Sequence, residues 1–298
     1  MSAGVYAARK KLKTLFVTLE FGGQSIVSDG IENWIGTVKI PGLELAKNLK
    51  EHLLAYADKS VLVKEGEKAL DIQKSADDFI VLTDKDKYET KTILIVTGSN
   101  RRKLEIPGAK EFDNKGLTYC ASCDGPLFAG QDVAVVGGGN AALETAAQLL
   151  AYCKSVTILN RAMDLRGDEI TIERLTKNPK LAIIKNAIPI EVKGNTFVAS
   201  IVYEDAISKE KKELPVAGIF IEIGLIPATD FAKNIIKLNK NNQIPIDPRN
   251  QKTEVSGIWA AGDCADVIYH QNNIAAGDAV KALEDIYMYI HNYSRKSI

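Results

Sequence analysis

The sequence predicts an α/β protein in which one unit is inserted between two pieces of another. The chain has 298 residues, which suggests two domains at roughly 100–200 residues per domain. Apolar runs typical of strands alternate with segments of helical period. The composition breaks at Asn100-Arg101-Arg102-Lys103, and the pattern changes again after Pro227. We therefore expect the boundaries of the inserted unit at these two places.

The first piece is expected to hold helices at 3–11 and at 43–57, where apolar residues recur at helical spacing. Residues 92–97 form a continuous apolar run that ends at Gly98. Such a run suits a strand that is buried on both faces of a parallel sheet. Further short strands are predicted at Thr14–Val17, Ser60–Val63, Phe79–Leu82 and Lys87–Thr90.

The inserted unit contains the clearest local pattern, a strand, a turn, a helix and a second strand. These are Asp132–Val136, Gly137-Gly138-Gly139, Asn140–Tyr152 and Ser155–Leu159, and together they predict a βαβ unit. Residues 181–186 and 197–203 alternate and predict an antiparallel hairpin, and 218–224 predicts another strand. In the last piece of the chain, 257–263 predicts a strand and 274–292 a long closing helix.

The composition excludes several classes of function. Lys plus Arg equals Asp plus Glu at 38 each, so the chain has no electrostatic footprint for nucleic acid and no polybasic segment for a membrane surface. No apolar run reaches the roughly 18 residues that a membrane span needs, and the N-terminus lacks the apolar core of a signal peptide. We therefore expect a cytoplasmic protein with no nucleic-acid or membrane partner.

Cys120 and Cys123 form a Cys-x-x-Cys pair in the stretch TYCASCDGPLF. In a reducing compartment this spacing indicates either redox chemistry or half of a metal site. If Cys120 begins a helix, its thiolate is stabilised and the pKa of its thiol falls toward ~7 or below. Asp124 follows the pair directly and is placed to transfer a proton.

Two alternatives to redox chemistry remain for this pair. A structural zinc ion needs four ligands, and the chain has no second such pair and three histidines, so no metal site is predicted. The other alternative is two inert core cysteines. Of the isolated cysteines, Cys153 is expected in the core, and Cys264, after a Gly-Asp turn, is expected near a ligand.

Gly137, Gly139 and Ala142 occupy the positions of G-x-G-x-x-G/A between a strand and a helix. The first small residue permits the tight turn, the second permits close approach of a pyrophosphate, and the third permits close packing of helix on strand. The helix N-terminus then supplies N–H donors to the phosphates. The pattern predicts a dinucleotide site, and the alternative is a glycine-rich turn without a ligand.

The end of the second strand bears on which nicotinamide dinucleotide binds. Asn160 stands there and carries no charge that would repel a 2′-phosphate, and Arg161 and Arg166 are able to pair with one. This favours NADPH, with NADH as the alternative if both arginines are only surface residues. Because hydride carries two electrons and a disulfide accepts two, a mediator is needed between nicotinamide and cysteines, and a flavin commonly serves. Asp263, in a Gly-Asp turn after a buried strand, is placed to bond a ribityl hydroxyl, although such turns are common without a ligand.

Together the motifs resemble low-molecular-weight thioredoxin reductase over essentially the whole chain. The segments that carry the resemblance are VTLEFGGQ (17–24), IENW (31–34), TILIVTGSNRRKLEIPG (92–108), GLTYCASCDGPLF (116–128), VAVVGGGNAALE (133–144), IEIGLIP (221–227), VSGIWAAGDCAD (255–266) and HQNNIAAGDA (270–279). The resemblance implies two Rossmann-like domains and a homodimer. The FAD-binding domain would be 1–101 plus 228–298, and the NAD(P)H-binding domain, 102–227, would be inserted in it and carry the cysteine pair.

The resemblance also implies a reaction and the roles of single residues. Reducing equivalents would pass from NADPH via FAD to the Cys120–Cys123 disulfide, and then by thiol exchange to thioredoxin. Cys123 would face the flavin, Cys120 would attack the disulfide of thioredoxin, and Asp124 would be the acid/base. Contacts to FAD are implied for Gly23, Gln24, Asn33, Thr97, Gly98, Asp263 and Gln271, and contacts to the nicotinamide dinucleotide for Gly137, Gly139, Asn140, Arg161 and Arg166.

The sequence departs from the family pattern in three places. The family begins with a strand and a G-x-G-x-x-G turn for the FAD pyrophosphate, whereas Met1 here stands just after that turn, inside the first helix. An internal methionine taken as the start and a real truncation both explain this, and a real truncation predicts weak flavin binding and poor stability. The arginine pair expected for a 2′-phosphate is Arg161-Ala162, and the usual arginine and glycine near the C-terminus are His270 and Ala279.

Rival functions follow from these departures. A related reductase that serves another thiol partner, such as a peroxidase or a glutaredoxin-like protein, is one alternative, although the usual fused domain of peroxide-reducing relatives is absent from this sequence. Relatives that reduce ferredoxin typically lack the cysteine pair, which argues against that activity. The alternative from a different class is a truncated, flavin-deficient, non-catalytic remnant that binds a nucleotide or a partner.

Overall fold

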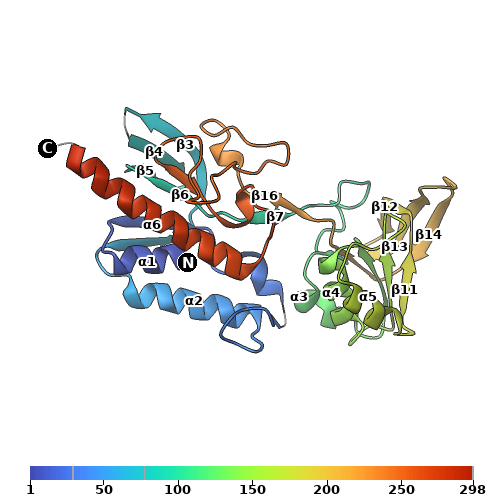
Figure 1. Ribbon diagram of the computed structural model, residues 1–298. Coiled ribbons are helices and arrows are strands. Elements are labelled where there is room, and N and C mark those ends of the chain that lie inside the picture. Colours follow the sequence, from blue (N-terminus) through green and yellow to red (C-terminus); the bar gives the residue numbers. More distant parts are fainter. Residues whose placement is uncertain (29, 77, 297–298) are drawn as a thin grey trace. The chain divides into compact units, whose positions relative to one another are not determined.

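The computed structural model of the protein describes residues 1–28, 30–76 and 78–296 and divides into two compact units (Figure 1). Unit 1 comprises Met1–Asn100 and Ile226–Ile298, and unit 2 comprises Arg101–Leu225. Both units are α/β, which is the fold class that the sequence predicts. Along the chain, unit 2 lies between the two pieces of unit 1. The chain passes between the units one residue before the first expected boundary and two residues before the second. The assignment of one cofactor to each unit stays a prediction.

A five-stranded parallel sheet forms the centre of unit 2, in the strand order β11-β10-β9-β15-β8. The predicted βαβ unit is confirmed, because β10 pairs in parallel with β9 and α4 lies between them in the chain. The strands of this sheet are β8 (Leu117–Thr118), β9 (Asp132–Val136), β10 (Ser155–Leu159), β11 (Leu181–Ile184) and β15 (Gly218–Ile221). The helices of unit 2 are α3 (Ala121–Asp124), η2 (Gly125–Phe128), α4 (Asn140–Leu149) and α5 (Glu169–Thr176).

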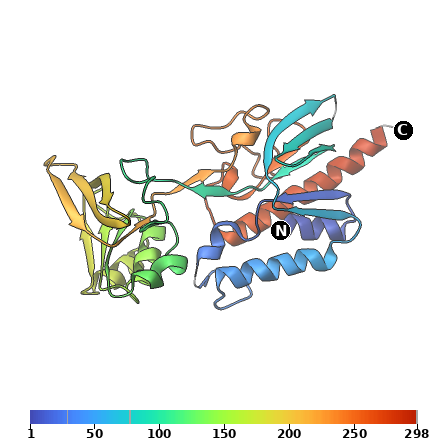
Figure 2. The same cartoon turned by 180° about the vertical axis from the view of Figure 1, so that it is seen from behind.

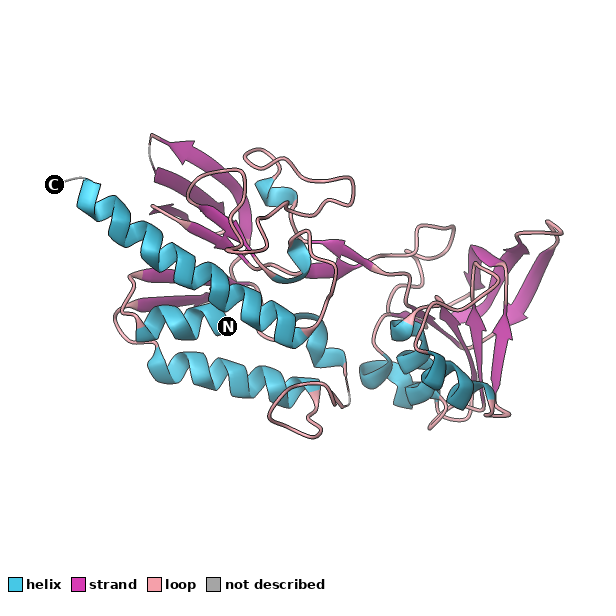
Figure 3. Cartoon of the chain, viewed as in Figure 1, coloured by secondary structure: helices cyan, strands magenta, loops and turns pink. Residues whose placement is uncertain are grey.

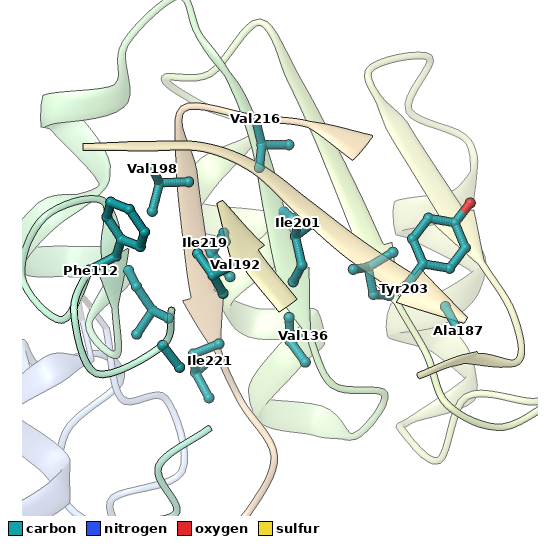
Figure 4. Packing of buried hydrophobic residues seen from close by; sticks show 14 residues of the cluster. Phe112, Val136, Ala187, Val192, Val198, Ile201, Tyr203, Val216, Ile219 and Ile221 are labelled. Atoms are coloured by element: carbon teal, nitrogen blue, oxygen red, sulfur yellow. The ribbon is translucent and has the colours of Figure 1, made fainter. Parts of the chain in front are cut away.

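Both faces of this sheet are covered, which explains the continuous apolar run of β9. Val133 and Val135 pack with buried residues of α4 and α5 on one face. Ala134 and Val136 belong to a second cluster on the other face, shown in Figure 4, where an antiparallel sheet supplies the partners. That sheet contains β12 (Ala187–Gly194), β13 (Val198–Asp205) and β14 (Lys211–Pro215). Unit 2 therefore has three layers, with helices, parallel strands and antiparallel strands in turn (Figure 3).

The predicted hairpin between 181–186 and 197–203 is wrong. Residues Leu181–Ile184 form β11, which pairs in parallel with β10 at the edge of the central sheet. The antiparallel partner of β13 is β12, which ends at Gly194, and residues 195–197 form the turn between them. The run Leu-Ala-Ile-Ile is apolar without alternation, which suits a parallel strand, whereas a hairpin partner is normally the neighbouring strand across a short glycine-containing turn.

Unit 1 repeats the three kinds of layer. Its predicted helices are confirmed as α1 (Ser2–Arg9), α2 (Gly42–Tyr56) and α6 (Asn272–Lys296), and α1 packs against both α2 and α6. Its parallel strands form two hydrogen-bonded pairs, β1 with β2 and β6 with β17. An antiparallel sheet of β3, β4 and β5, cyan in Figure 2, completes the unit. Its side chains share a hydrophobic cluster with those of β6 and β17.

The remaining bounds in unit 1 are close to the predicted ones. The strands are β1 (Thr14–Thr18), β2 (Val61–Glu65), β3 (Ala69–Ser75), β4 (Asp78–Thr83), β5 (Lys87–Thr90), β6 (Ile93–Ile95) and β17 (Ile258–Ala260), with short 3-10 helices η1 (Gly23–Val27), η3 (Asp230–Ala232) and η4 (Gly262–Cys264). Where the chain passes between the units, β7 (Ser99–Arg101) pairs with β16 (Leu225–Pro227). The sequence did not predict β3, β7 or β16, which are short or carry exposed polar residues.

The packing of unit 2 leads to a stability prediction for Phe220. This side chain in β15 is 1% exposed, and its ring packs edge-on against Phe128 at 5.5 Å between centroids. Phe220→Ala should lower the free energy of unfolding by about 3–5 kcal/mol, because it leaves a cavity in the core. Phe197→Ala, at a residue that is 63% exposed, is the control and should change it by less than about 0.5 kcal/mol. Urea unfolding of both variants measures this, and equal losses would contradict the described packing.

Candidate active site

Cys120 and Cys123 form a disulfide with their Cα atoms 5.3 Å apart. Cys120 is the N-cap of α3, and its Sγ accepts a hydrogen bond of 3.1 Å from the backbone N–H of Cys123. A donated N–H favours the thiolate over the thiol once the disulfide is open. Cys123 is exposed and Cys120 half-buried, so an external thiol or disulfide has access to this pair.

Asp124 lies beside the pair and is held by Thr118. The hydroxyl of Thr118, a residue that is 5% exposed, donates to Asp124 Oδ2 and accepts a 3.3 Å hydrogen bond from the backbone N–H of Cys120. Thr118 therefore ties the carboxylate and the start of the Cys-x-x-Cys turn to strand β8. Sequence reasoning missed Thr118, and its position two residues before Cys120 is the only signal for it.

The glycine turn after β9 has the close contacts that its sequence predicts. Gly137 has φ +148°, and a Cβ there would lie 2.2 Å from the carbonyl oxygen of Glu222. A Cβ at Gly138 would lie 2.2 Å from Asn160 Oδ1, whereas a Cβ at Gly139 would meet no atom within 4 Å. Gly139 is the N-cap of α4 and no side chain caps that helix. Neighbouring atoms therefore pack against Gly137 and Gly138, whereas the space beside Gly139 is open. This arrangement fits a pyrophosphate bound at the first N–H groups of α4.

The two arginines expected near a 2′-phosphate lie in the loop that contacts this turn. The backbone N–H of Arg166 donates to the Gly138 carbonyl at 2.6 Å, and both Arg161 and Arg166 are exposed. In the part of the chain that the structure describes, neither side chain has a salt-bridge partner. Asn160 is 4% exposed, and its Nδ2 donates to the carbonyls of Ala162 and Asp164. Asn160 therefore fixes the loop that carries the arginines.

Asn140 has a structural partner as well. Its Oδ1 accepts a 2.7 Å hydrogen bond from the backbone N–H of Asp168, which is the N-cap of α5. This contact joins the starts of α4 and α5 next to the glycine turn. The residues present therefore fit a nicotinamide dinucleotide: an open turn, an uncapped helix start and two available guanidinium groups.

The residues predicted to contact FAD come together in unit 1 from three distant segments. Gln24 Nε2 donates to the carbonyl of Ser99 at 3.2 Å, and Ser99 Oγ lies 3.5 Å from Asp263 Oδ2. Asn33 Nδ2 donates to Gln271 Oε1 at 2.6 Å. Sequence reasoning missed Ser99, which follows the predicted Thr97-Gly98 turn directly and joins the first of these segments to the third.

Two glycines show where this cluster is open. Gly23 and Gly98 have φ +54° and +63°, and a Cβ at either would meet no atom within 4 Å. Thr97 Oγ1 donates to the Ala228 carbonyl at 2.7 Å, which anchors the turn that contains Gly98. Amide, carboxylate and hydroxyl groups therefore gather beside unfilled backbone turns, which fits the polar contacts that a flavin nucleotide needs.

The departures near the C-terminus have local explanations. His270 Nδ1 lies 3.3 Å from Asp263 Oδ1, so the histidine keeps a polar contact with the predicted ribityl partner. Ala279 is 7% exposed and packs with Ala3 and Leu283 between helices α1 and α6. A small side chain is what this helix contact requires.

The other two cysteines are core residues. Cys153 packs with the helices of unit 2, and burial raises the pKa of its thiol. Cys264 is fully buried and donates from Sγ to the Ala261 carbonyl, and burial raises the pKa of its thiol too. Within residues 1–28, 30–76 and 78–296, no three His, Cys, Asp or Glu side chains gather as a metal-binding group. Among the same described residues, no helix has the length and apolar character that crossing a membrane requires.

Comparisons with known proteins agree with this geometry. The family model described as "Pyridine nucleotide-disulphide oxidoreductase" matches residues 1–280. NADH dehydrogenase of Bacillus subtilis (strain 168) is 36% identical over 289 residues, which are 97% of this chain and 56% of that protein. An alkyl hydroperoxide reductase component of Staphylococcus epidermidis is 39% identical over 290 residues, with the same two coverages, 97% and 56%. The chain spans about half the length of the curated relatives it matches.

Solved structures resemble the chain over nearly its full length. Lactococcus lactis thioredoxin reductase in its FR conformation has a TM-score of 0.92 at 34% identity, covering 98% of this chain and 95% of that one. Thioredoxin reductase of T. acidophilum has a TM-score of 0.88 at 33% identity, covering 96% and 93%. Given the family match, the fold and the redox disulfide, this chain belongs to the pyridine nucleotide-disulphide oxidoreductase family, which implies FAD and NADPH as its cofactors.

Proposed function

We propose that this chain is an NAD(P)H-dependent thioredoxin-disulfide reductase. The observation that carries the proposal is the Cys120–Cys123 disulfide, which lies in the same unit as an open dinucleotide-type glycine turn. A reductase needs both a source of electrons and a disulfide that exchanges with a partner. Bound FAD would supply the two-electron link between the nicotinamide and the disulfide.

We further propose distinct roles for the two cysteines and Asp124. Cys123 would face the flavin, and Cys120 would attack the disulfide of the partner as a thiolate, favoured by the N–H that its Sγ accepts. The sulfur that leaves the partner disulfide does so as a thiolate, which takes up a proton. Asp124, held by Thr118 beside the pair, would act as the acid/base.

The cofactor contacts follow from the two clusters. The polar groups at Gly23, Gln24, Asn33, Thr97, Gly98, Asp263 and Gln271 would hold FAD in residues 1–101 plus 228–298. The groups at Gly137, Gly139, Asn140, Arg161 and Arg166 would hold NADPH in residues 102–227. The space beside Gly23 and Gly98 in the first cluster, and beside Gly139 in the second, is open, which supports this division.

Thioredoxin is the proposed partner because the structural neighbours at 34% and 33% identity are thioredoxin reductases. A second candidate is reduction of another thiol protein, such as a peroxidase, since a curated relative at 39% identity belongs to an alkyl hydroperoxide reductase. Measuring the rate of NADPH-dependent reduction with thioredoxin and with a peroxidase disulfide as the substrate distinguishes these two activities. A homodimer in the cytoplasm stays a prediction that the resemblance supports.

Replacing either redox cysteine gives the first test. Cys120→Ser and Cys123→Ser should each reduce NADPH-driven thioredoxin turnover by several orders of magnitude, because neither variant can form the disulfide. Flavin reduction by NADPH, followed by flavin absorbance, should remain largely intact in both. Cys153→Ala is the control, since it removes a buried cysteine outside the pair, and it should retain turnover. Full activity in either Ser variant would refute the assignment.

The nucleotide site gives a second test. Arg161→Ala and Arg166→Ala should each weaken NADPH binding about 10–100-fold, because a charge-assisted hydrogen bond to the 2′-phosphate contributes about 1.5–3 kcal/mol. Binding of NADH, which has no 2′-phosphate, should change little. Calorimetric titration with both nucleotides measures the difference, and Arg174→Ala, on the exposed side of α5, is the control. If both nucleotides lose affinity equally, the arginines do not read the 2′-phosphate.

A further inference from the structure

Unit 2 contains an ion pair that the proposed reaction does not use. Arg101 Nη1 lies 2.9 Å from Glu222 Oε1, and their side chains are only 20% and 8% exposed. Thr145 Oγ1 donates to the same carboxylate oxygen at 2.8 Å. Arg101 Nη1 also donates to the backbone carbonyl of Tyr119. We call these four residues the Arg101–Glu222 network.

The network joins the two halves of the candidate site in unit 2. Tyr119 immediately precedes Cys120, so the guanidinium holds the peptide that enters the redox turn. Thr145 is on α4, the helix that begins at the glycine turn. Glu222 follows β15, its N–H donates to the Val136 carbonyl at 2.8 Å, and its own carbonyl packs against Gly137.

Removing one member of a buried ion pair leaves an uncompensated charge rather than merely a lost contact. Burial raises the pKa of Glu222, whereas the Arg101 guanidinium and the Thr145 hydroxyl lower it. The net direction is a raised pKa, with burial as its largest cause. Because the carboxylate oxygen lies 2.9 Å from the guanidinium, the ionised form of Glu222 opposes the positive charge next to the Tyr119–Cys120 peptide. The other charged groups nearby are Glu144, which raises the pKa of Glu222, the Lys103–Asp113 pair beside the Tyr119 ring, and Asp124.

We propose that Glu222 is a positioning residue for the redox pair. It acts through Arg101: it fixes and neutralises the guanidinium that holds the carbonyl before Cys120, and thereby sets how readily the Cys120 thiol ionises. The inference deepens the proposed function, since it concerns the same cysteines. It does not depend on flavin, nicotinamide or thioredoxin, because ionisation of Cys120 is a property of the protein alone.

Two substitutions that should shift the pKa of Cys120 in opposite directions test this proposal. In a Cys123→Ser background, Cys120 is the only accessible thiol, because Cys153 and Cys264 are 1% and 0% exposed. Glu222→Gln keeps the shape but removes the negative charge that lies 2.9 Å from the guanidinium, so the pKa of Cys120 should fall by about half a unit or more. Arg101→Gln leaves the carboxylate unopposed, so the pKa should rise by a similar amount. The rate of iodoacetamide alkylation as a function of pH measures both.

The double variant Arg101→Gln plus Glu222→Gln carries neither charge and should return the pKa of Cys120 close to that of the unaltered background. Glu213→Gln is the matched control, because Glu213 also accepts from a cation and a hydroxyl, Lys193 and Ser200, but in an exposed pair. It should leave the pKa of Cys120 unchanged.

A merely structural role predicts a different result. If both single variants shift the pKa of Cys120 in the same direction, or if neither differs from Glu213→Gln, the proposal is overturned. If Glu222→Gln fails to fold, Arg101→Gln and the double variant still show the direction in which the pKa of Cys120 shifts. If the chain with both redox cysteines shows no thioredoxin turnover while the predicted pKa shifts are observed, the proposed function is overturned and this inference stands.

Discussion

The parallel register of four neighbouring strands is the constraint on which the candidate site of unit 2 depends. Strands β8, β15, β9 and β10 run in the same direction, so their carboxyl ends meet at one edge of the sheet. The chain leaves these ends at the cysteine segment, at Glu222, at the glycine turn and at Asn160. Ligands of open α/β sheets bind at this edge. The disulfide, the dinucleotide turn and the buried ion pair are therefore neighbours because of strand direction.

The same logic applies within unit 1. Strands β6 and β17 are parallel neighbours, and the Thr97-Gly98 and Gly262-Asp263 turns follow their carboxyl ends. Hydrogen bonds then join these turns to Gln24 through Ser99 and to the 263–271 segment through Asp263. A polar cluster that is scattered over more than two hundred residues of sequence is thus assembled by two short strands and the loops that follow them.

Local patterns predicted the parts of the structure that depend on neighbouring residues. The glycine turn, the strand before it and the helix after it could be predicted because each is specified within about twenty residues. The hairpin was wrong because 181–184 is a short apolar strand whose partner, β10, is chosen by the sheet rather than by a turn. The Arg101–Glu222 network was not predictable, since Arg101 and Glu222 are 121 residues apart and no periodic pattern links them.

The central claim is that a nicotinamide dinucleotide delivers its electrons to the Cys120–Cys123 disulfide of this chain. The most direct measurement is a thiol count by alkylation and mass spectrometry after anaerobic incubation of the full chain with FAD and NADPH. The account predicts that Cys120 and Cys123 are both labelled when the two cofactors are present, and neither when one is omitted. A disulfide that dithiothreitol reduces but that stays intact with both cofactors would contradict it.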